Sequence, residues 1–257
     1  MPQPLPEWRA DRLAALAAPD GWLNLTDRVE IAPGNRYAVG QGAENGLHIS
    51  AGPDHLGVLT VAADGSASLT TPQGQELPFT PIPGAPPRLS VANLILEIHV
   101  AEGQPALRVR QIDHPRRLRD PGLRYFPDAP DWVIRAKWQP LAAPQQAEVD
   151  MIGGRRETVQ LTHQAVFTHD GQVFTLMPTH WKSGAPMFVI RDLTAGSETY
   201  PAARFLIGED VTDSEITLDF NKAHTPPCGF TDYAICPLPP RENILPFGIE
   251  AGEKRPL

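Results

Sequence analysis

The chain has 257 residues, which is enough for one large β domain or two smaller ones, each with its own hydrophobic core. Its formal net charge is −8, which argues against nucleic acid or an anionic membrane as the main partner, because neutralising phosphates needs an excess of Lys and Arg. The 29 prolines and 21 glycines predict many turns and short strands rather than long helices.

The sequence carries none of the standard signals for export, membrane insertion or common catalytic chemistry. The start, MPQPLPEWRADRL, lacks the pattern of a signal peptide, and no apolar run approaches the roughly 18 residues of a membrane span. G-x-S-x-G, P-loop, H-E-x-x-H and C-x2-C motifs are missing. We therefore expect a cytoplasmic protein with no cofactor, and the sequence leaves open whether it is an enzyme.

One helix is predicted at the start of the chain, within residues 1–20. Pro6 suits a first helical turn, Glu7 complements the positive end of the helix dipole, and Pro19 and Gly21 end the helix. The apolar side chains expected to pack on the β core are Trp8, Leu13, Leu16 and Ala17.

Residues 21–103 are predicted to form a β-sandwich-like subdomain. Asp64-Gly65 predicts a two-residue hairpin turn, because both residues tolerate positive φ. The proline-rich stretch Thr80–Arg88 is interpreted as a connection. The expected strands are Arg36–Val39, Gly57–Ala62, Ser66–Thr71 and Asn93–Ala101.

Residues 104–257 are predicted to form a second antiparallel β sandwich or barrel, closed by a proline-rich irregular tail. Six prolines lie from Thr225 to Pro246, and each fixes φ and lacks an amide donor, so side chains are expected to hold the tail. The fold class is therefore all-β with one short helix. The expected strands are Trp132–Trp138, a hairpin about Asp170-Gly171 within Ala165–Leu176, Met187–Arg191, Ala203–Ile207 and Glu215–Phe220.

Arginines gather in one stretch of this otherwise acidic chain. A guanidinium group matches the two oxygens of a carboxylate or phosphate. We therefore expect Arg116, Arg117 or Arg204 to help bind an anionic small molecule, with a solvated loop paired to Asp113 and Asp120 as the alternative. The cluster itself comprises Arg108, Arg110, Arg116, Arg117, Arg119 and Arg124.

The two cysteines and one histidine of the tail allow more than one interpretation. His224, Cys228 and Cys236 are spaced as H-x3-C-x7-C, which lacks the compact ligand pairs of structural zinc sites, and no metal is expected. Cys228 could be a nucleophile with His224 as its base, although the intervening Thr-Pro-Pro would separate them. The alternative is that both thiols are small buried hydrophobes.

Polar tail residues could either contact a ligand or support the backbone. Asn221, Tyr233 and Asn243 are candidate ligand contacts. As scaffolding, the two asparagines would replace missing backbone partners, and each change to alanine would then cost about 1 to 3 kcal/mol. The same choice applies to Asp219, Glu242 and Lys254.

The tail and the segment IRDLTAGSETYPAARFL before it resemble a known family. The order RF-L, DFN-A, PPC, a second Cys, PLPP, EN and AGEK is similar to that of the bacterial domain-of-unknown-function family 1684. His224 and Thr225 stand where that family tends to carry Tyr-Asn. The resemblance extends to WRADRLAAL and GWLNL near the start, and it implies membership of a family without implying an activity.

A second resemblance concerns the first half. NRYAVGQGAENGLHIS followed by HLGVLTV is similar to a forkhead-associated-type β-sandwich. Phosphothreonine recognition in that fold uses an Arg after the glycine and a later Ser-Arg pair. Here Gln41 follows Gly40, and Asp54-His55 lies near the second position. The resemblance therefore implies the shape without phosphothreonine recognition.

Three functions follow as hypotheses. The leading one is a small anionic ligand bound in a pocket that the tail closes. The second is an enzyme of unassigned reaction that uses Cys228 or the Arg and Asn groups, and the third is an interaction module with an unknown protein partner. The expected ligand contacts are Arg116, Arg117, Arg204, Asn221, Tyr233 and Asn243.

Overall fold

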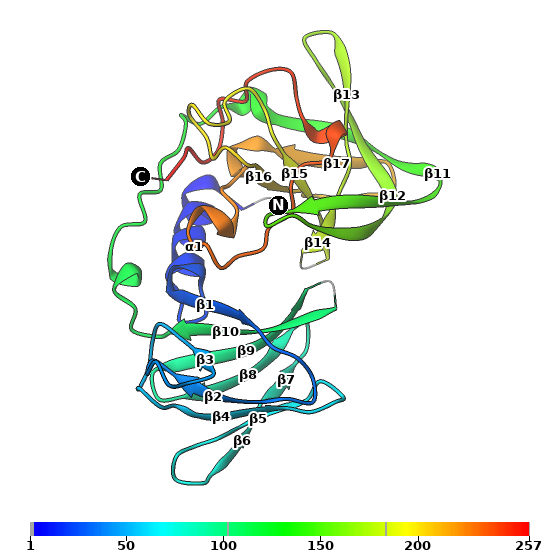
Figure 1. Ribbon diagram of the computed structural model, residues 1–257. Helices are drawn as coiled ribbons and strands as arrows, with labels where there is room; N and C mark the ends of the chain where they lie inside the picture. Colours follow the sequence, from blue (N-terminus) through cyan, green and yellow to red (C-terminus); the bar gives the residue numbers. More distant parts are fainter. Residues whose placement is uncertain (1–2, 102, 183, 257) are drawn as a thin grey trace. The chain divides into compact units, whose positions relative to one another are not determined.

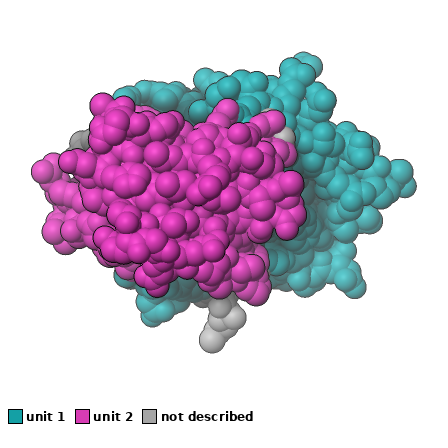
Figure 2. Space-filling view, turned by 60° about the horizontal axis from the view of Figure 1, so that its bottom comes forward, with its two compact units in different colours: residues 1–13, 121–230, 235–257 teal, residues 14–120, 231–234 magenta. Residues whose placement is uncertain are grey.

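The computed structural model describes residues 3–101, 103–182 and 184–256 (Figure 1). These residues form many β-strands, one α-helix and short 3₁₀ helices, which confirms the predicted all-β class with a short N-terminal helix. The chain divides into two compact units (Figure 2). Unit 1 comprises residues 1–13, 121–230 and 235–257, and unit 2 comprises residues 14–120 and 231–234.

The helix α1 covers Leu5–Ala17 and has an acidic residue, Glu7, in its first turn. Leu16 is fully buried whereas Leu13 is 43% exposed, so the packed face is narrower than predicted. After the helix the chain turns back at Gly21. A glycine is needed there, because a Cβ would lie 2.3 Å from the Leu16 carbonyl oxygen. Among the described residues, no helix combines the length and the apolar character that crossing a membrane requires.

Unit 2 is built from two five-stranded sheets that share one hydrophobic core. Val39, Leu59 and Leu69 from one sheet and Leu96 and Leu107 from the other belong to the same buried cluster. The first sheet has the order β1-β10-β9-β8-β7, from Leu25–Glu30 (β1), Gln104–Gln111 (β10), Leu94–Ala101 (β9), Ala85–Val91 (β8) and Thr80–Ile82 (β7). The second has the order β3-β2-β4-β5-β6, from Leu47–His48 (β3), Arg36–Gly40 (β2), Gly57–Val61 (β4), Ala67–Thr70 (β5) and Glu76–Pro78 (β6).

Two features of unit 2 differ from the sequence interpretation. The stretch Thr80–Arg88 is not a connection, and that prediction is wrong: it contains β7 and the start of β8, which pair as a hairpin. Pro81 is tolerated because β7 is the edge strand of its sheet, where a missing amide breaks no ladder. Pro86 and Pro87 lie in β8 before Arg88, the first residue of β8 that pairs with β9. The expected boundary near residue 104 falls at the start of β10, which pairs with both β9 and β1 and therefore lies within unit 2.

Unit 1 contains a four-stranded sheet, β13-β12-β11-β17, and a three-stranded sheet, β14-β15-β16. Trp138, Phe167 and Leu218 of the first sheet and Phe188 and Leu206 of the second belong to one buried cluster. The strands are Val133–Met151 (β11), Arg155–His169 (β12), Gln172–Leu176 (β13), His180–Lys182 (β14), Ala185–Ile190 (β15), Arg204–Ile207 (β16) and Glu215–Asp219 (β17). Figure 1 shows β11 and β12 as a long curved hairpin.

The tail after β17 is irregular but ordered. It contains three 3₁₀ helices, Phe220–Lys222, Pro227–Gly229 and Arg241–Asn243, and its apolar side chains Leu245 and Ile249 are buried. Side chains were expected to hold the tail, but backbone hydrogen bonds to the strands and loops of unit 1 also hold it. These bonds include Leu238 N to Asp150 O at 2.7 Å, Leu245 N to Arg191 O at 2.7 Å and Phe126 N to Gly252 O at 3.0 Å.

A buried ion pair between Glu253 and Arg12 also holds the tail. Glu253 is fully buried, and its carboxylate accepts hydrogen bonds from Arg12 Nε at 2.9 Å and from the Thr225 amide at 2.8 Å. Arg12 also donates to the Thr225 carbonyl oxygen at 2.7 Å. The carboxylate thus satisfies the buried backbone amide of Thr225, which lies directly before two prolines in the irregular tail.

Candidate functional site

A cavity of about 120 Å³ lies in unit 1, between the β11–β12 hairpin and the tail. Most of its walls are apolar, and its polar atoms come from a glutamine, a threonine and a glutamate. The residues that line it are Gln145, Ala147 and Val149 of β11, Val159 and Leu161 of β12, Met177 and Thr179 after β13, and Pro240 and Glu242 of the tail.

The hairpin wall follows from the two-residue period of a strand. Ala147 lies opposite Val159, and Gln145 lies opposite Leu161, so these side chains share one face. Their chain neighbours in β11, such as Gln146 and Glu148, point to the other face and are exposed. The pairing register shifts between Pro140 and Gln145, and such an irregularity bends a strand. The wall therefore belongs to the curved outer half of the hairpin.

The opposite wall is fixed by Asn243, one of the predicted site residues. Asn243 is completely buried, and its Oδ1 accepts a hydrogen bond from the Met177 amide at 2.7 Å. Its Nδ2 donates to the carbonyl oxygens of Met177 and Val189, both at 2.9 Å. Because Met177 and the neighbouring Glu242 both line the cavity, Asn243 positions two of its walls.

The chemistry of the cavity suits a small molecule with an apolar body. An apolar protein cavity of about 150 Å³ is known to stay dry and to accept benzene, so the space here has the size of a small ring. Gln145 and Glu242 are exposed and mark the mouth, whereas Thr179 is buried. Glu242 supplies the only charged side chain among the described lining residues, and its charge is negative.

Arg204, an expected ligand contact, is used within the core of unit 1. It is 1% exposed, and its Nη2 lies 2.6 Å from Oδ2 of the equally buried Asp192. The guanidinium also donates to the carbonyl oxygens of Ile249 at 3.1 Å and Ala251 at 2.5 Å in the tail. Burial alone would raise the pKa of Asp192, but the Arg204 charge and hydrogen bonds from Thr194 outweigh it and hold that pKa below its ordinary value.

Arg116 and Arg117 lie in unit 2 and donate to backbone carbonyl groups. Arg116 Nη2 donates to Leu25 O at 3.2 Å. Arg117 donates from Nε to Ala17 O at 2.6 Å and from Nη1 to Ile112 O. Neither side chain lines the cavity.

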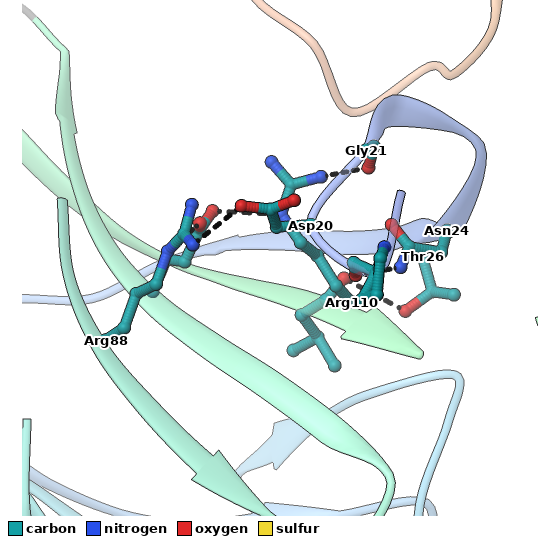
Figure 3. Close-up of polar contacts among 9 residues, drawn as sticks. Asp20, Gly21, Asn24, Thr26, Arg88 and Arg110 are labelled. Carbon is teal, nitrogen blue, oxygen red and sulfur yellow. Dashed lines mark hydrogen bonds and ion pairs between the residues drawn. The ribbon is translucent and has the colours of Figure 1, made fainter. Parts of the chain in front are cut away.

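Other arginines of unit 2 form an ion-pair network around Glu97. Glu97 is 1% exposed and accepts from Arg88 Nε at 2.9 Å and from Arg110 Nε at 3.2 Å. Arg88 Nη1 also donates to Asp20 Oδ2 at 2.9 Å, and Arg110 Nη1 donates to the Gly21 carbonyl oxygen. Both contacts are drawn in Figure 3. Arg110 of the sequence cluster is therefore neutralised inside unit 2.

The remaining expected contacts also make internal bonds. Asn221 is 1% exposed; its Oδ1 accepts from the Ala129 amide and its Nδ2 donates to the Ala129 carbonyl oxygen, both at 2.9 Å. Tyr233 is half-buried, and its amide donates to Thr231 Oγ1 at 3.3 Å. Of the six expected contacts, Asn243 bonds directly to a cavity residue, Met177.

The tail thiols are reduced, with Cys228 half-buried and Cys236 buried. His224 is buried, its Nδ1 lies 3.0 Å from Lys222 O, and its ring packs 5.9 Å from that of Trp8. Burial, reinforced by the Arg12 charge, holds the pKa of His224 well below its ordinary value, so its ring is neutral at pH 7. Within residues 3–101, 103–182 and 184–256, no group of three or more His, Cys, Asp or Glu side chains is placed to hold a metal ion.

The cavity walls on β11 and β12 were not among the residues singled out from the sequence. Ala147, Val149 and Met151 alternate with polar residues, as do Val159 and Leu161, and this alternation is a strand signal. The small size of Ala147 and the proline-containing segment before it make the signal weak. A search for alternation alone would nevertheless have found both walls.

Comparison with known proteins assigns the chain to a family. A family model described as "Protein of unknown function (DUF1684)" matches residues 121–254, which is just over half of the chain. The chain therefore belongs to this family, as the tail motifs indicated. One similar solved structure is the solution NMR structure of the uncharacterized protein from gene locus rrnAC0354 of Haloarcula marismortui, with 31% identity over 51% of this chain and 75% of that chain and a TM-score of 0.43. None of the curated proteins matches.

Proposed function

We propose that unit 1 binds a small, mainly apolar ligand in the cavity between the β11–β12 hairpin and the tail. The observation that supports this proposal is a mainly apolar space of about 120 Å³ whose lining includes three polar side chains. The expected anionic ligand would need a cation at the cavity, and its lining residues include a carboxylate instead. A ligand with an amine or another hydrogen-bond donor at the mouth, near Glu242 and Gln145, is therefore favoured.

The size of the cavity limits the affinity. A ligand of about six to eight non-hydrogen atoms gains at most roughly 1.5 kcal/mol per atom, and most gain far less. Dissociation constants from about micromolar to millimolar are therefore expected. The flexible Met177 side chain can adjust the wall to ligands of slightly different shape.

A matched set of three probes tests the charge preference. Benzylamine, toluene and benzoate share a ring and differ in the group that would lie at the mouth. We expect benzylamine to shift the NMR signals of the cavity residues with the lowest dissociation constant and benzoate with the highest. Glu242→Gln should weaken benzylamine about tenfold, which corresponds to about 1.4 kcal/mol, and should leave toluene unchanged.

Two neighbouring substitutions in β11 test the location. Ala147→Leu adds three carbon atoms to the cavity wall, whereas Gln146→Leu adds apolar surface to the opposite, exposed face of the same strand. We expect the first to abolish binding of benzylamine and toluene and the second to leave both unchanged. Benzoate binding as tightly as benzylamine would contradict the charge preference, and unchanged binding in Ala147→Leu would contradict the site.

The forkhead-associated-like resemblance of residues 21–103 supports a second proposal, an interaction role for unit 2. Its support in the structure is the pair of five-stranded sheets around one core. The loop positions are held by internal bonds: Gln41 Nε2 donates to Ser50 O at 2.7 Å and Asn45 Nδ2 donates to Asp54 O at 2.6 Å. Titration with a phosphothreonine peptide should therefore produce no saturable shift of these amides, and saturable binding would contradict the absence of phosphate recognition.

A further inference from the structure

The two cysteines of the tail approach each other closely although seven residues separate them in the sequence. The Cys228 amide donates a hydrogen bond to the Cys236 sulfur at 3.3 Å. Both thiols are free, and they differ in access, since Cys228 is half-buried whereas Cys236 is 2% exposed. An accessible thiol beside a buried one is the arrangement found where one cysteine reacts first and the second resolves the product.

We propose that Cys228 and Cys236 form a reversible disulfide through exchange with small-molecule disulfides, with Cys228 as the attacking thiol and Cys236 as the resolving thiol. The contact between the Cys228 amide and the Cys236 sulfur places this sulfur next to the Cys228 backbone. A disulfide requires the Cβ atoms to lie about 3.5–4.5 Å apart, and the Cys236 sulfur is already in contact with the Cys228 backbone.

The surroundings of Cys228 favour its thiolate. A hydrogen bond from the Cys236 thiol is the main cause, and, against the opposing effect of burial, it holds the pKa of Cys228 below its ordinary value with the help of the Tyr200 hydroxyl. Because the thiolate is the nucleophile in disulfide exchange, a lowered pKa gives Cys228 a larger reactive fraction at neutral pH than free cysteine has.

The backbone on both sides of the pair is fixed. The Tyr200 hydroxyl donates to Cys228 O at 3.1 Å. A Cβ on Gly229 would lie 2.3 Å from Thr225 Cγ2 and 3.3 Å from the Tyr200 ring, so the turn is tightly packed after Cys228. Cys236 O accepts a hydrogen bond from the Ile152 amide at 2.9 Å. These contacts hold the two thiols as neighbours before oxidation.

The exchange proceeds in two displacements. The Cys228 thiolate attacks one sulfur of a disulfide RSSR, the S–S bond breaks, and RS⁻ leaves with a mixed disulfide on Cys228. Cys236 then loses its proton and attacks the Cys228 sulfur, which expels the second RS⁻. The two protein thiols are oxidised to one disulfide, RSSR is reduced to two thiols, and the two protons from the protein end on those thiols.

Mass spectrometry of the full-length protein tests this proposal with oxidised glutathione as the probe. Trypsin cleavage after Lys222 and Arg241 releases one peptide that contains both cysteines. We expect this peptide to lose two hydrogen atoms after incubation with oxidised glutathione, without retained glutathione, and to recover them with dithiothreitol. A peptide that stays reduced, or that retains glutathione on either cysteine without closing, overturns the proposal.

Three variants assign the roles. Cys236→Ser should stop at a stable glutathione adduct on Cys228, and Cys236→Ala should do the same if the serine variant does not fold. Cys228→Ser should leave the buried Cys236 unmodified until urea is added. Tyr200→Phe should shift the pH profile of Cys228 alkylation to higher pH while leaving its alkaline limit unchanged. Adduct formation on Cys236 in folded Cys228→Ser protein, or alkylation of Cys228 no faster than that of free cysteine at pH 7 in the parent protein, overturns the assignment.

Discussion

Replacing Asn243 with alanine tests whether a single buried side chain fixes the tail against the strands of unit 1. Asn243 is completely buried and makes three side-chain hydrogen bonds, of 2.7, 2.9 and 2.9 Å, to the backbone of Met177 and Val189. Alanine would remove them and leave one buried amide and two buried carbonyl groups without these partners. A hydrogen bond contributes about 1 kcal/mol net, and an unsatisfied buried group costs roughly 1–3 kcal/mol, so we expect a loss of about 3 kcal/mol.

Two measurements check this value. Urea unfolding gives the loss of stability, and hydrogen exchange of the Met177 amide gives the local effect, since that amide loses its partner Asn243 Oδ1. Asn35→Ala is the matched control, because Asn35 is exposed and donates over 3.2–3.4 Å to the carbonyl oxygens of two nearby residues. We expect the control to lose under about 0.5 kcal/mol. A loss below about 1 kcal/mol for Asn243→Ala, with unchanged exchange at Met177, would refute the reasoning.

Three further substitutions probe buried charge and backbone strain. Asp192→Asn should cost about 3–5 kcal/mol in thermal or urea unfolding, because it leaves Arg204 buried without its carboxylate. The pKa of Asp192 is lowered in the fold, so the ion pair should stabilise the parent fully above the unfolded pKa of about 3.9. This stabilisation should be lost as the pH falls through the folded pKa. An equal loss of stability at acid pH in Asp192→Asn would contradict the assignment. Glu97→Gln should destabilise unit 2 by about 3 kcal/mol, because the buried Arg110 loses the carboxylate that it contacts while Arg88 keeps its ion pair with Asp20. A change below about 1 kcal/mol would show the network to be dispensable. Gly252→Ala should lower the free energy of unfolding in urea more than Gly74→Ala does. Both glycines have positive φ, but a Cβ at Gly252 would also lie 2.4 Å from a backbone carbonyl oxygen. Equal losses of stability would show that this contact relaxes freely.

The β class could be predicted because its signals are local. Asp170-Gly171 marks a tight turn, and both residues adopt positive φ, 48° and 75°, where β12 and β13 meet. Alternation in Trp132–Trp138 likewise predicted part of β11. The stretch Thr80–Arg88 was misjudged because local proline content does not show whether a strand lies at the edge of its sheet.

The roles of polar residues could not be predicted, because their partners are distant in the sequence. Asn243 bonds to Met177, which is 66 positions away, and Asn221 bonds to Ala129, 92 positions away. Nothing local separates an asparagine that contacts a ligand from one that completes a backbone bond. The cavity has the same difficulty, because its walls come from two strands, a connection and the tail.

In unit 1 the buried polar residues position the tail, whereas the strands form the cavity wall. The tail turns too often for a continuous ladder, so its carbonyl groups need donors from elsewhere. Arg204 supplies donors to Ile249 and Ala251, and Asn243 ties the segment beside Glu242 to Met177. These side chains set the position of the tail, whereas the shape and polarity of the cavity depend on the β11 and β12 side chains and on Glu242. A change of ligand preference should therefore follow substitution of the hairpin wall or Glu242, whereas substitution of Arg204 or Asn243 should lower the stability of the tail first.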